Sequence, residues 1–192
     1  MATAERSAFE AECTRSLKAL QTRAVPLALP SSAEEIWQRV RVTLQKAVRA
    51  ELLKTSAHEV FRLLRRVGCT QRGTNGTYYE FSCGPTNDER KRPDSRDCLV
   101  RDDGAVLSFS VTLGEHPSAT GLELLAYRYD LTFPRSEGPS FVRFDLDWPN
   151  QGHDKDGLRA HIHPGLKEGR LPSPILAPSE AIQFLLVHLR AC

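Results

Sequence analysis

The strongest constraint on the fold is a two-residue alternation of apolar and polar side chains that recurs in three successive segments. Residues 125–131 read LAYRYDL, residues 141–148 read FVRFDLDW, and residues 158–163 read LRAHIH. Because successive side chains of a β-strand point to opposite faces, the alternation predicts neighbouring strands with one core-facing side, which includes Trp148. The opposite face gathers the ionisable residues: Arg128, Asp130, Arg143, Asp145, Asp147, Arg159, His161 and His163.

Two earlier stretches also have strand patterns. Tyr78, Tyr79 and Phe81 mark one strand, and residues 99–113 (LVRDDGAVLSFSVTL) predict a hairpin that turns at Asp103-Gly104. Strands that follow one another through short turns, with no helix between them, form antiparallel sheets. We therefore expect a central antiparallel sheet, closed by a helix over residues 179–189.

The first third of the chain has helical patterns instead. Residues 5–23 have helical composition, and two capping boxes follow, which begin at Ser32 and Ser56. The second box predicts a short helix that runs through Val67 and ends at Gly68. The first box opens a helix with an apolar stripe at helical spacing, formed by Ile36, Val40, Leu44 and Ala47.

Together these patterns predict an α+β fold with N-terminal helices, a central antiparallel β-sheet and a C-terminal helix packed on the sheet. A chain of 192 residues fits one domain, or a small domain with a helical appendage. We divide it into a helical N-terminal region, residues 1–67, and an antiparallel sheet with its C-terminal helix, residues 68–192. One continuous domain is the alternative.

Composition narrows the classes of protein that fit. The first twenty residues are polar and amphipathic, unlike a secretory signal, and no apolar run approaches the ~18 residues that span a bilayer. The five cysteines form no C-x-x-C pair, which argues against a disulfide framework and a zinc ribbon. We therefore expect a cytoplasmic protein with no membrane partner.

Positive charge is concentrated in one segment, although the whole chain carries a net charge of only +2. Residues 39–72 hold nine basic side chains against two acidic ones, Glu51 and Glu59. Such asymmetry marks a surface for phosphate-rich partners, RNA or DNA, or for an acidic protein; solvated helix faces are the alternative. The candidate nucleic-acid-binding or partner-binding residues, here and on the sheet, are Arg62, Arg65, Arg66, Arg128 and Arg159.

The segment His161-Ile162-His163 places two imidazoles on one side of a strand, with Cα atoms ~6.5–7 Å apart. That separation suits two ligands of one metal ion, and Asp145, Asp147 or His153 would complete the set. The cofactor expectation is therefore either none or a divalent metal ion. Opposite charges that pair on a solvated sheet face are the alternative interpretation.

A metal-free site would use the same strands for phosphodiester cleavage. His161 and His163 would act as general base and general acid on an RNA backbone, since histidine exchanges protons near neutral pH. Arg143, Arg128 or Arg159 would stabilise charge on the phosphorane, and the aspartates, Asp145 among them, would orient the imidazoles. The candidate catalytic residues are therefore His161, His163, Arg143 and Asp145.

Residues 122–190 resemble the TumE-type toxins of bacterial toxin–antitoxin pairs in short motifs. The matching positions are Arg143-Phe144-Asp145, His153 and His161-Ile162-His163, before a Pro-rich stretch and a last apolar helix. The resemblance implies ribonuclease-like attack on nucleic acid, in growth control or phage defence, and a dedicated protein partner such as an antitoxin.

The chain departs from that pattern in three respects. Phe144 stands where the family tends to have tyrosine, Asp147-Trp148-Pro149 replaces the usual continuation of the strand, and the helical first seventy residues are additional. The added helices favour an alternative function, a non-catalytic accessory subunit of a bacterial defence complex. Such a subunit would use the basic helices and the polar sheet face as contact surfaces, so an enzyme and a binding protein both fit these motifs.

Overall fold

A computed structural model of the chain describes residues 2–21, 29–71, 77–85, 95–115, 121–134, 140–165 and 169–190. The described helices are α1 (Ala2–Gln21), α2 (Ala33–Arg49), α3 (Ala57–Leu63) and α4 (Pro178–Val187), with 3-10 turns η1 (Ser95–Asp97) and η2 (Gly152–Asp156). The strands are β1 (Leu64–Gln71), β2 (Thr77–Cys83), β3 (Leu99–Val100), β4 (Val106–Glu115), β5 (Leu122–Thr132), β6 (Phe141–Leu146), β7 (Ala160–Pro164) and β8 (Leu171–Pro172).

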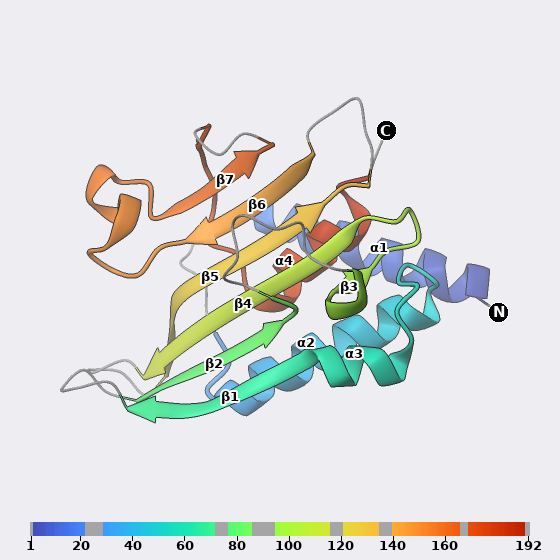
Figure 1. Cartoon of the computed structure of the whole chain (residues 1–192), viewed down its shortest axis with the longest axis horizontal. Helices are drawn as coiled ribbons and strands as arrows, with labels where there is room; N and C mark the ends of the chain where they lie inside the picture. Colours follow the sequence, from blue (N-terminus) through green and yellow to red (C-terminus); the bar gives the residue numbers. More distant parts are fainter. Residues whose placement is uncertain are drawn as a thin grey trace.

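The strands form one antiparallel sheet in the order β1-β2-β4-β5-β6-β7-β8, and β3 pairs with β4 (Figure 1). Each described neighbour along this path is antiparallel. The hairpin at Asp103-Gly104 is present, and Gly104 takes the positive φ that the turn requires. The α+β prediction is therefore confirmed, including the helices at both ends of the chain.

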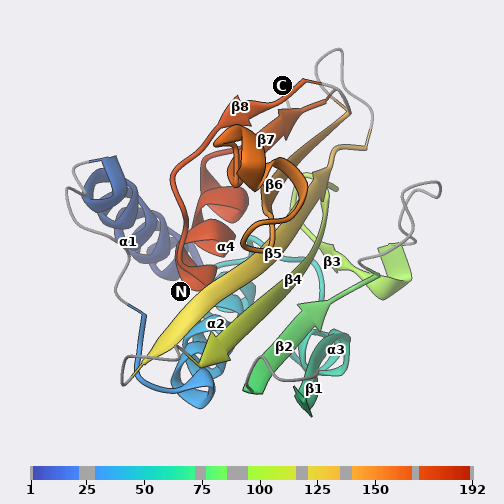
Figure 2. The same ribbon diagram turned by 90° about the vertical axis from the view of Figure 1, so that its left-hand side faces the viewer.

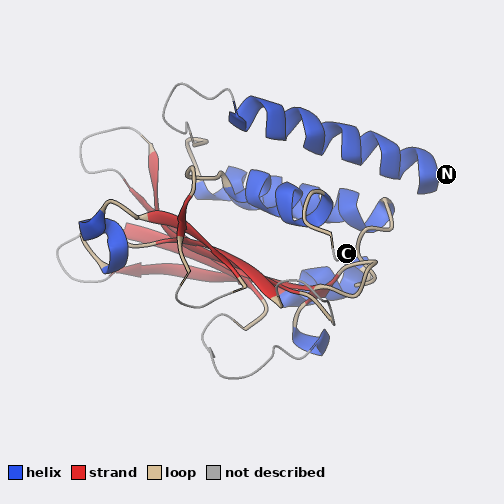
Figure 3. Ribbon diagram, turned by 90° about the horizontal axis from the view of Figure 1, so that it is seen from above, coloured by secondary structure: helices blue, strands red, loops and turns tan. Residues whose placement is uncertain are grey.

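Helices cover one face of the sheet (Figures 2 and 3). Helices α2 and α4 lie next to the strands, and α1 forms an outer layer against them. The ring of Phe144 on β6 contacts that of Phe184 on α4, with centroids 5.7 Å apart, so the apolar side of the strand faces the helices. The other side, here called the open face, points away from α1, α2 and α4.

The local helix signals agree with the structure. The Ser32 side chain accepts a hydrogen bond from the Glu35 amide at 3.2 Å, and Ser56 and Glu59 form a complete capping box. The predicted apolar stripe of α2 is buried in the core, where each large aliphatic side chain contributes ~1.5–3 kcal/mol. The cap fixes where the helix begins, and the stripe fixes its inner face.

The predicted helix from Ser56 to Gly68 is wrong in its second half. Helix α3 ends at Leu63, and β1 runs from Leu64 to Gln71, where it pairs with β2. Gly68 lies at an irregularity in this ladder rather than after a helix. Leu63, Leu64 and Val67 fit a helical period, but the hydrogen bonds that β2 offers to β1 decide the conformation.

A domain boundary at residue 67 would therefore cut through β1. The helices and the sheet also share one core, which joins Leu44 of α2, Phe109 of β4 and Leu185 of α4. This arrangement supports the alternative of one continuous domain.

A buried arginine joins the β3–β4 hairpin to the end of α4. Arg101 is 0% exposed, and its guanidinium donates to the carbonyl oxygens of Leu185 and Leu189. Asp103 balances its charge, with Nε and Oδ1 3.1 Å apart. The hairpin thus supplies partners for carbonyls at a helix C-terminus, which lack them within the helix.

The described cysteines Cys13, Cys83 and Cys98 are buried and form no disulfide bond. Burial raises the pKa of the thiols of Cys13 and Cys83 to about 12, so both remain protonated and unreactive. Within the described ranges, the helices are too short or too polar to cross a bilayer.

Candidate functional site

Three adjacent strands turn their ionisable side chains to the open face, as the alternation predicts. In one row across β7, β6 and β5, His161 pairs with Asp145 and Asp145 with Arg128. In the next row, His163 pairs with Arg143, which pairs in turn with Asp130. The register therefore brings all four predicted catalytic residues into one cluster, on the side opposite the helices.

Asp145 is at the centre of this cluster. Its Oδ2 atom lies 2.8 Å from Nε of Arg143, 3.3 Å from Nε2 of His163 and 3.7 Å from Nε2 of His161. One carboxylate oxygen thus faces a guanidinium and two imidazoles. Burial raises the pKa of Asp145, an effect that the positive charges of Arg143 and Arg128 partly offset.

The cluster is buried even though no main helix covers it. His161 and His163 are 1% and 2% exposed, and the side chains of Asp145 and Arg143 are 14% and 13% exposed. The alternative of charges paired on a solvated face is therefore wrong for β7. Removing two imidazoles and a carboxylate from water lowers the stability of the fold. Buried groups of ionisable side chains that carry this cost are typical of functional sites.

The backbone orients the ring of His161. Its Nδ1 atom lies 2.9 Å from the carbonyl oxygen of Leu158, which can only accept a hydrogen bond. Nδ1 therefore carries a hydrogen, and Nε2 faces Asp145, with Nε2 and Oδ2 3.7 Å apart. A proton or a cation between Nε2 and the carboxylate would stabilise this arrangement.

A second group of ligand atoms shares His161. Asp147 follows β6, His153 lies on η2, and their ligand atoms are within 4.8 Å of each other and of His161. The ring centroids of His153 and His161 are 5.3 Å apart, and those of His161 and His163 are 4.9 Å apart. Three imidazoles therefore stand in a row along the open face.

The glycine-rich loop positions this second group. Oδ2 of Asp147 accepts a hydrogen bond from the His153 amide at 2.7 Å. Gly152 has φ +54°, and a Cβ atom there would overlap the Asp147 carboxylate. The sequence GHDKDG thus starts with glycine because the backbone turns left-handed where it approaches an acidic side chain.

Both groups have the donor set of a transition-metal site. Each combines two imidazoles and one carboxylate, either Asp145 with His161 and His163 or Asp147 with His153 and His161. Such sets hold Zn²⁺, or Fe²⁺ when three ligands leave other positions open. The hydrogen bond from Nδ1 of His161 to a carbonyl is the outer contact that metal-ligating histidines usually make.

Two predicted binding arginines on this side have local partners. Nε of Arg128 lies 2.6 Å from Oδ2 of Asp130. Arg159 precedes β7 and donates to the carbonyl oxygens of Asp147, Leu124 and Leu125 at 3.0–3.1 Å. The guanidinium of Arg159 thus joins the end of β6 to β5.

The other three predicted binding residues lie far from the cluster. Arg62 is on α3, whereas Arg65 and Arg66 are on β1, at the opposite edge of the sheet from β7 and β8. All three are exposed, and Arg66 forms an ion pair with Glu34. The structure therefore gives the basic segment and the histidine cluster separate surfaces.

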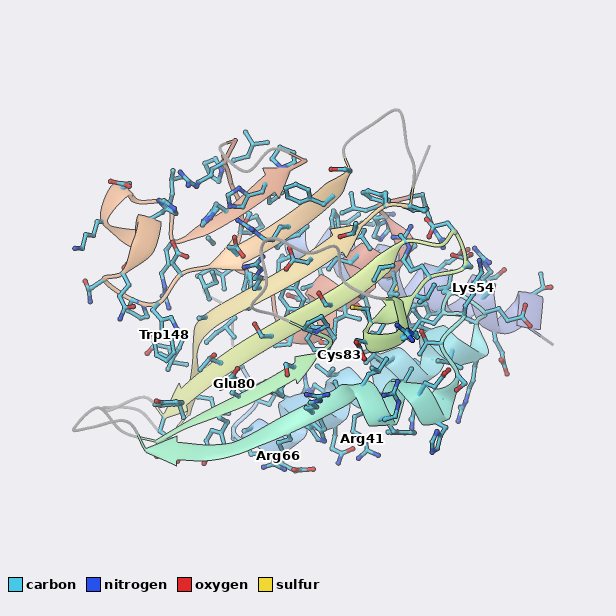
Figure 4. All side chains as sticks on the ribbon, viewed as in Figure 1. Arg41, Lys54, Arg66, Glu80, Cys83 and Trp148 are labelled. Atoms are coloured by element: carbon cyan, nitrogen blue, oxygen red, sulfur yellow. The ribbon has the colours of Figure 1, made fainter. Side chains whose placement is uncertain are left out.

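The expectation that Trp148 faces the core is wrong, because β6 ends at Leu146. Trp148 is 36% exposed, and its ring meets that of Tyr78 edge-on at 5.9 Å (Figure 4). Tyr78 lies on the open face, since Phe81 and Cys83 of the same strand alternate with it and are buried. Pro149, next in the chain, was the sequence signal that the strand ends here.

Comparison with protein-family models, curated proteins and solved structures finds no match. The resemblance to TumE-type toxins therefore rests on the short motifs alone.

Proposed function

We propose that the protein binds a divalent transition-metal ion through His161, His163 and Asp145 and is a metal-dependent phosphodiesterase that acts on nucleic acid. One observation carries the proposal: His161 donates from Nδ1 to the Leu158 carbonyl and turns its Nε2 atom toward the Asp145 carboxylate, which the second imidazole, His163, also faces. A cation at that position satisfies all three groups.

The burial of the ligands favours a metal ion over a solvated ion-pair cluster. Neutral imidazoles and one carboxylate form a tight site when they are held in place before the ion arrives. Asp145 already stands beside Arg143, so this chain stabilises the carboxylate without the ion. Asp147 and His153 supply a second pair of donors around the same His161.

A bound divalent ion supplies Lewis acidity toward a phosphoryl oxygen and activates water for attack. Hydrolysis forms one P–O bond to the water oxygen, breaks the ester P–O bond, and moves one proton to the leaving oxygen. His153 is suited to move that proton, because its side chain is 33% exposed beside His161 and imidazole is the commonest proton carrier in enzymes.

The substrate class follows from the charge around the cluster and from the family resemblance. Arg143 and Arg128 flank the carboxylate, and guanidinium groups stabilise the charge that develops on a phosphorane. The motif resemblance implies nucleic acid as the target and a protein partner that restrains the activity. Single-stranded RNA is therefore the first substrate to test.

Metal content is the first test. Purified full-length protein is incubated with Zn²⁺, Mn²⁺ or Fe²⁺, separated from free ions and analysed by mass spectrometry of the elements. We expect about one ion per chain, loss of the ion in His161→Ala, and retention in the matched control His58→Ala, which alters an exposed histidine of α3. A folded wild-type protein that retains none of these ions overturns the proposed metal centre.

Cleavage of end-labelled single-stranded RNA is the second test. We expect cleavage that EDTA abolishes and that His161→Ala loses while His58→Ala keeps it. Metal binding without cleavage of RNA or DNA would overturn the enzymatic half of the proposal and favour a binding subunit.

A metal-free acid–base pair is the second candidate, and the position of Asp145 between two imidazoles favours it. In that mechanism one imidazole removes the proton of the ribose 2′-hydroxyl and the other protonates the leaving oxygen. Cleavage would then resist EDTA and leave a 2′,3′-cyclic phosphate, which end-group analysis detects.

A further inference from the structure

A second candidate site lies near the other edge of the sheet, in the basic segment. A cavity of about 260 Å³ lies between two parts of the chain. One is α3 with the segment that precedes it, and the other is β3 with η1. Lys54, labelled in Figure 4, lies in the connection between α2 and α3. The residues that line the cavity are Lys54, Thr55, Glu59, Arg62, Leu63, Arg96, Cys98 and Val100.

The lining carries an excess of positive charge. Among the lining residues that the structure describes, Lys54, Arg62 and Arg96 provide three cations, and Glu59 is the one acidic residue. The Glu59 carboxylate already accepts hydrogen bonds from Ser56, whose amide and hydroxyl donate to Oε2 at 3.0 and 2.8 Å. These described residues give the lining a formal charge of +2, which attracts anions.

Buried contacts hold the wall of the cavity in place. The Lys54 amide donates to the Val100 carbonyl at 2.8 Å, and Oγ1 of Thr55 accepts from the Val100 amide at 2.7 Å. Thr55 is only 7% exposed, and its own O–H hydrogen has no acceptor within the part of the chain that the structure describes. A buried hydroxyl donor thus stands among three cations.

Two of the cationic groups, those of Lys54 and Arg62, retain donors for a ligand. Nη2 of Arg62 donates to the Arg96 carbonyl at 3.1 Å, which orients the guanidinium and leaves its other N–H groups. The Lys54 ammonium has no ion pair with any residue in the described ranges. Fixed backbone contacts and unshared charged donors are the features of an anion site.

We propose that this cavity binds a phosphomonoester. A phosphate group carries close to two negative charges at neutral pH, which matches the charge of the lining, and its oxygens accept from guanidinium, ammonium and hydroxyl donors. The volume exceeds that of a phosphate ion, so part of an attached group enters as well. The cavity lies near α3, which leads into β1, whereas the proposed metal centre includes β7, toward the opposite edge of the sheet. The inference therefore does not rest on the metal centre.

Calorimetric titration of the full-length protein tests the site. Inorganic phosphate and adenosine monophosphate are the probes, and adenosine is the uncharged comparison. We expect both phosphates to bind and adenosine not to bind. Lys54→Ala and Arg62→Gln should each weaken binding at least about tenfold, since each removes a charged donor.

Arg49→Gln and Arg65→Gln are the matched controls, because both residues are exposed basic side chains of the same segment outside the lining. Equal weakening in the controls and the cavity variants would overturn the site and indicate general attraction to a basic surface. Absence of phosphate binding by the folded wild-type protein would overturn it as well. Retained phosphate binding in His161→Ala would separate this site from the metal centre.

The same titration distinguishes two sources of the phosphomonoester. A 5′-phosphorylated oligonucleotide that binds more tightly than both its unphosphorylated form and adenosine monophosphate identifies a nucleic-acid end as the ligand. Tighter binding of the mononucleotide identifies a free nucleotide. Equal binding of the phosphorylated and unphosphorylated oligonucleotides contradicts the proposal.

Discussion

Nδ1 of His161 is hydrogen-bonded to the Leu158 carbonyl oxygen at 2.9 Å, three residues back along the same chain. This contact orients the ring, determines which nitrogen holds the hydrogen, and aims Nε2 at Asp145 and its neighbours. A local backbone turn thus prepares a side chain for a ligand before the ligand binds.

The two overlapping ligand groups should differ in importance. A metal ion that binds the folded state raises the melting temperature, and the rise grows with the logarithm of the ion concentration relative to its dissociation constant. We expect His163→Ala to remove this rise in melting temperature. Loss of a metal ligand weakens metal affinity by more than the ~10–100-fold that follows loss of a hydrogen bond to a ligand. His153→Ala should keep most of it, since that residue is one-third exposed on the loop.

Thermal melting with and without Zn²⁺ or Mn²⁺ provides the measurement. The reverse pattern, with His153 essential and His163 dispensable, would transfer the ion to the group formed with Asp147.

Asp145 should make the metal-free protein less stable as pH rises. Its folded pKa is raised above the ordinary value of 3.8, so the folded state binds more protons than the unfolded state between the two values. The stability that protonated Asp145 contributes is present below about pH 4 and is lost as pH rises through its folded pKa. Asp145→Asn should remove this part of the pH dependence.

Urea unfolding in EDTA at pH values from about 3.5 to 7 spans the ordinary pKa of aspartate. It measures how the unfolding free energies of the wild type and of Asp145→Asn depend on pH. Asp156→Asn is the control, because its side chain is 71% exposed. Identical pH slopes for the wild type and Asp145→Asn would contradict a raised pKa.

Gly152→Ala should disrupt the loop that carries His153. The substitution places a side chain at φ +54° and against the Asp147 carboxylate, so strain and overlap add. We expect a loss of ~1–3 kcal/mol in unfolding free energy. Gly157→Ala also meets a positive φ, +72°, but enters open space, so denaturant unfolding should show a smaller loss. A loss of equal size in both variants would mean that the contact with Asp147 contributes nothing.

Arg101→Ala should be among the most destabilising single changes. It leaves the carbonyls of Leu185 and Leu189 and the charge of Asp103 without their partner in a buried site. We expect a cost of ~3–5 kcal/mol in unfolding free energy. Arg39→Ala, at an exposed ion pair with Glu35, should cost less than about 1 kcal/mol in the same denaturant titration. Comparable losses in the two variants would contradict a central role for Arg101.

Local sequence patterns predicted the features that depend on near neighbours. Ser56 and Glu59 cap a helix because their contacts span three residues, and alternation assigned Asp145 and His161 to one face because side chains of a strand point to alternating sides. Patterns failed where a distant strand competed. Leu64 and Val67 fit a helical period, yet both pair with β2, which the local pattern cannot represent.

The sequence by itself determined the α+β class, with helices at both ends of the chain, and the sheet face that Asp145, His161 and His163 share, because both follow from the local period of the chain. Only the tertiary structure decided that the imidazoles of His161 and His163 are buried, that the loop bearing His153 folds back beside them, and that Arg101 meets the end of α4. Burial and convergence depend on segments that are distant in the sequence, and no local period encodes which of them become neighbours.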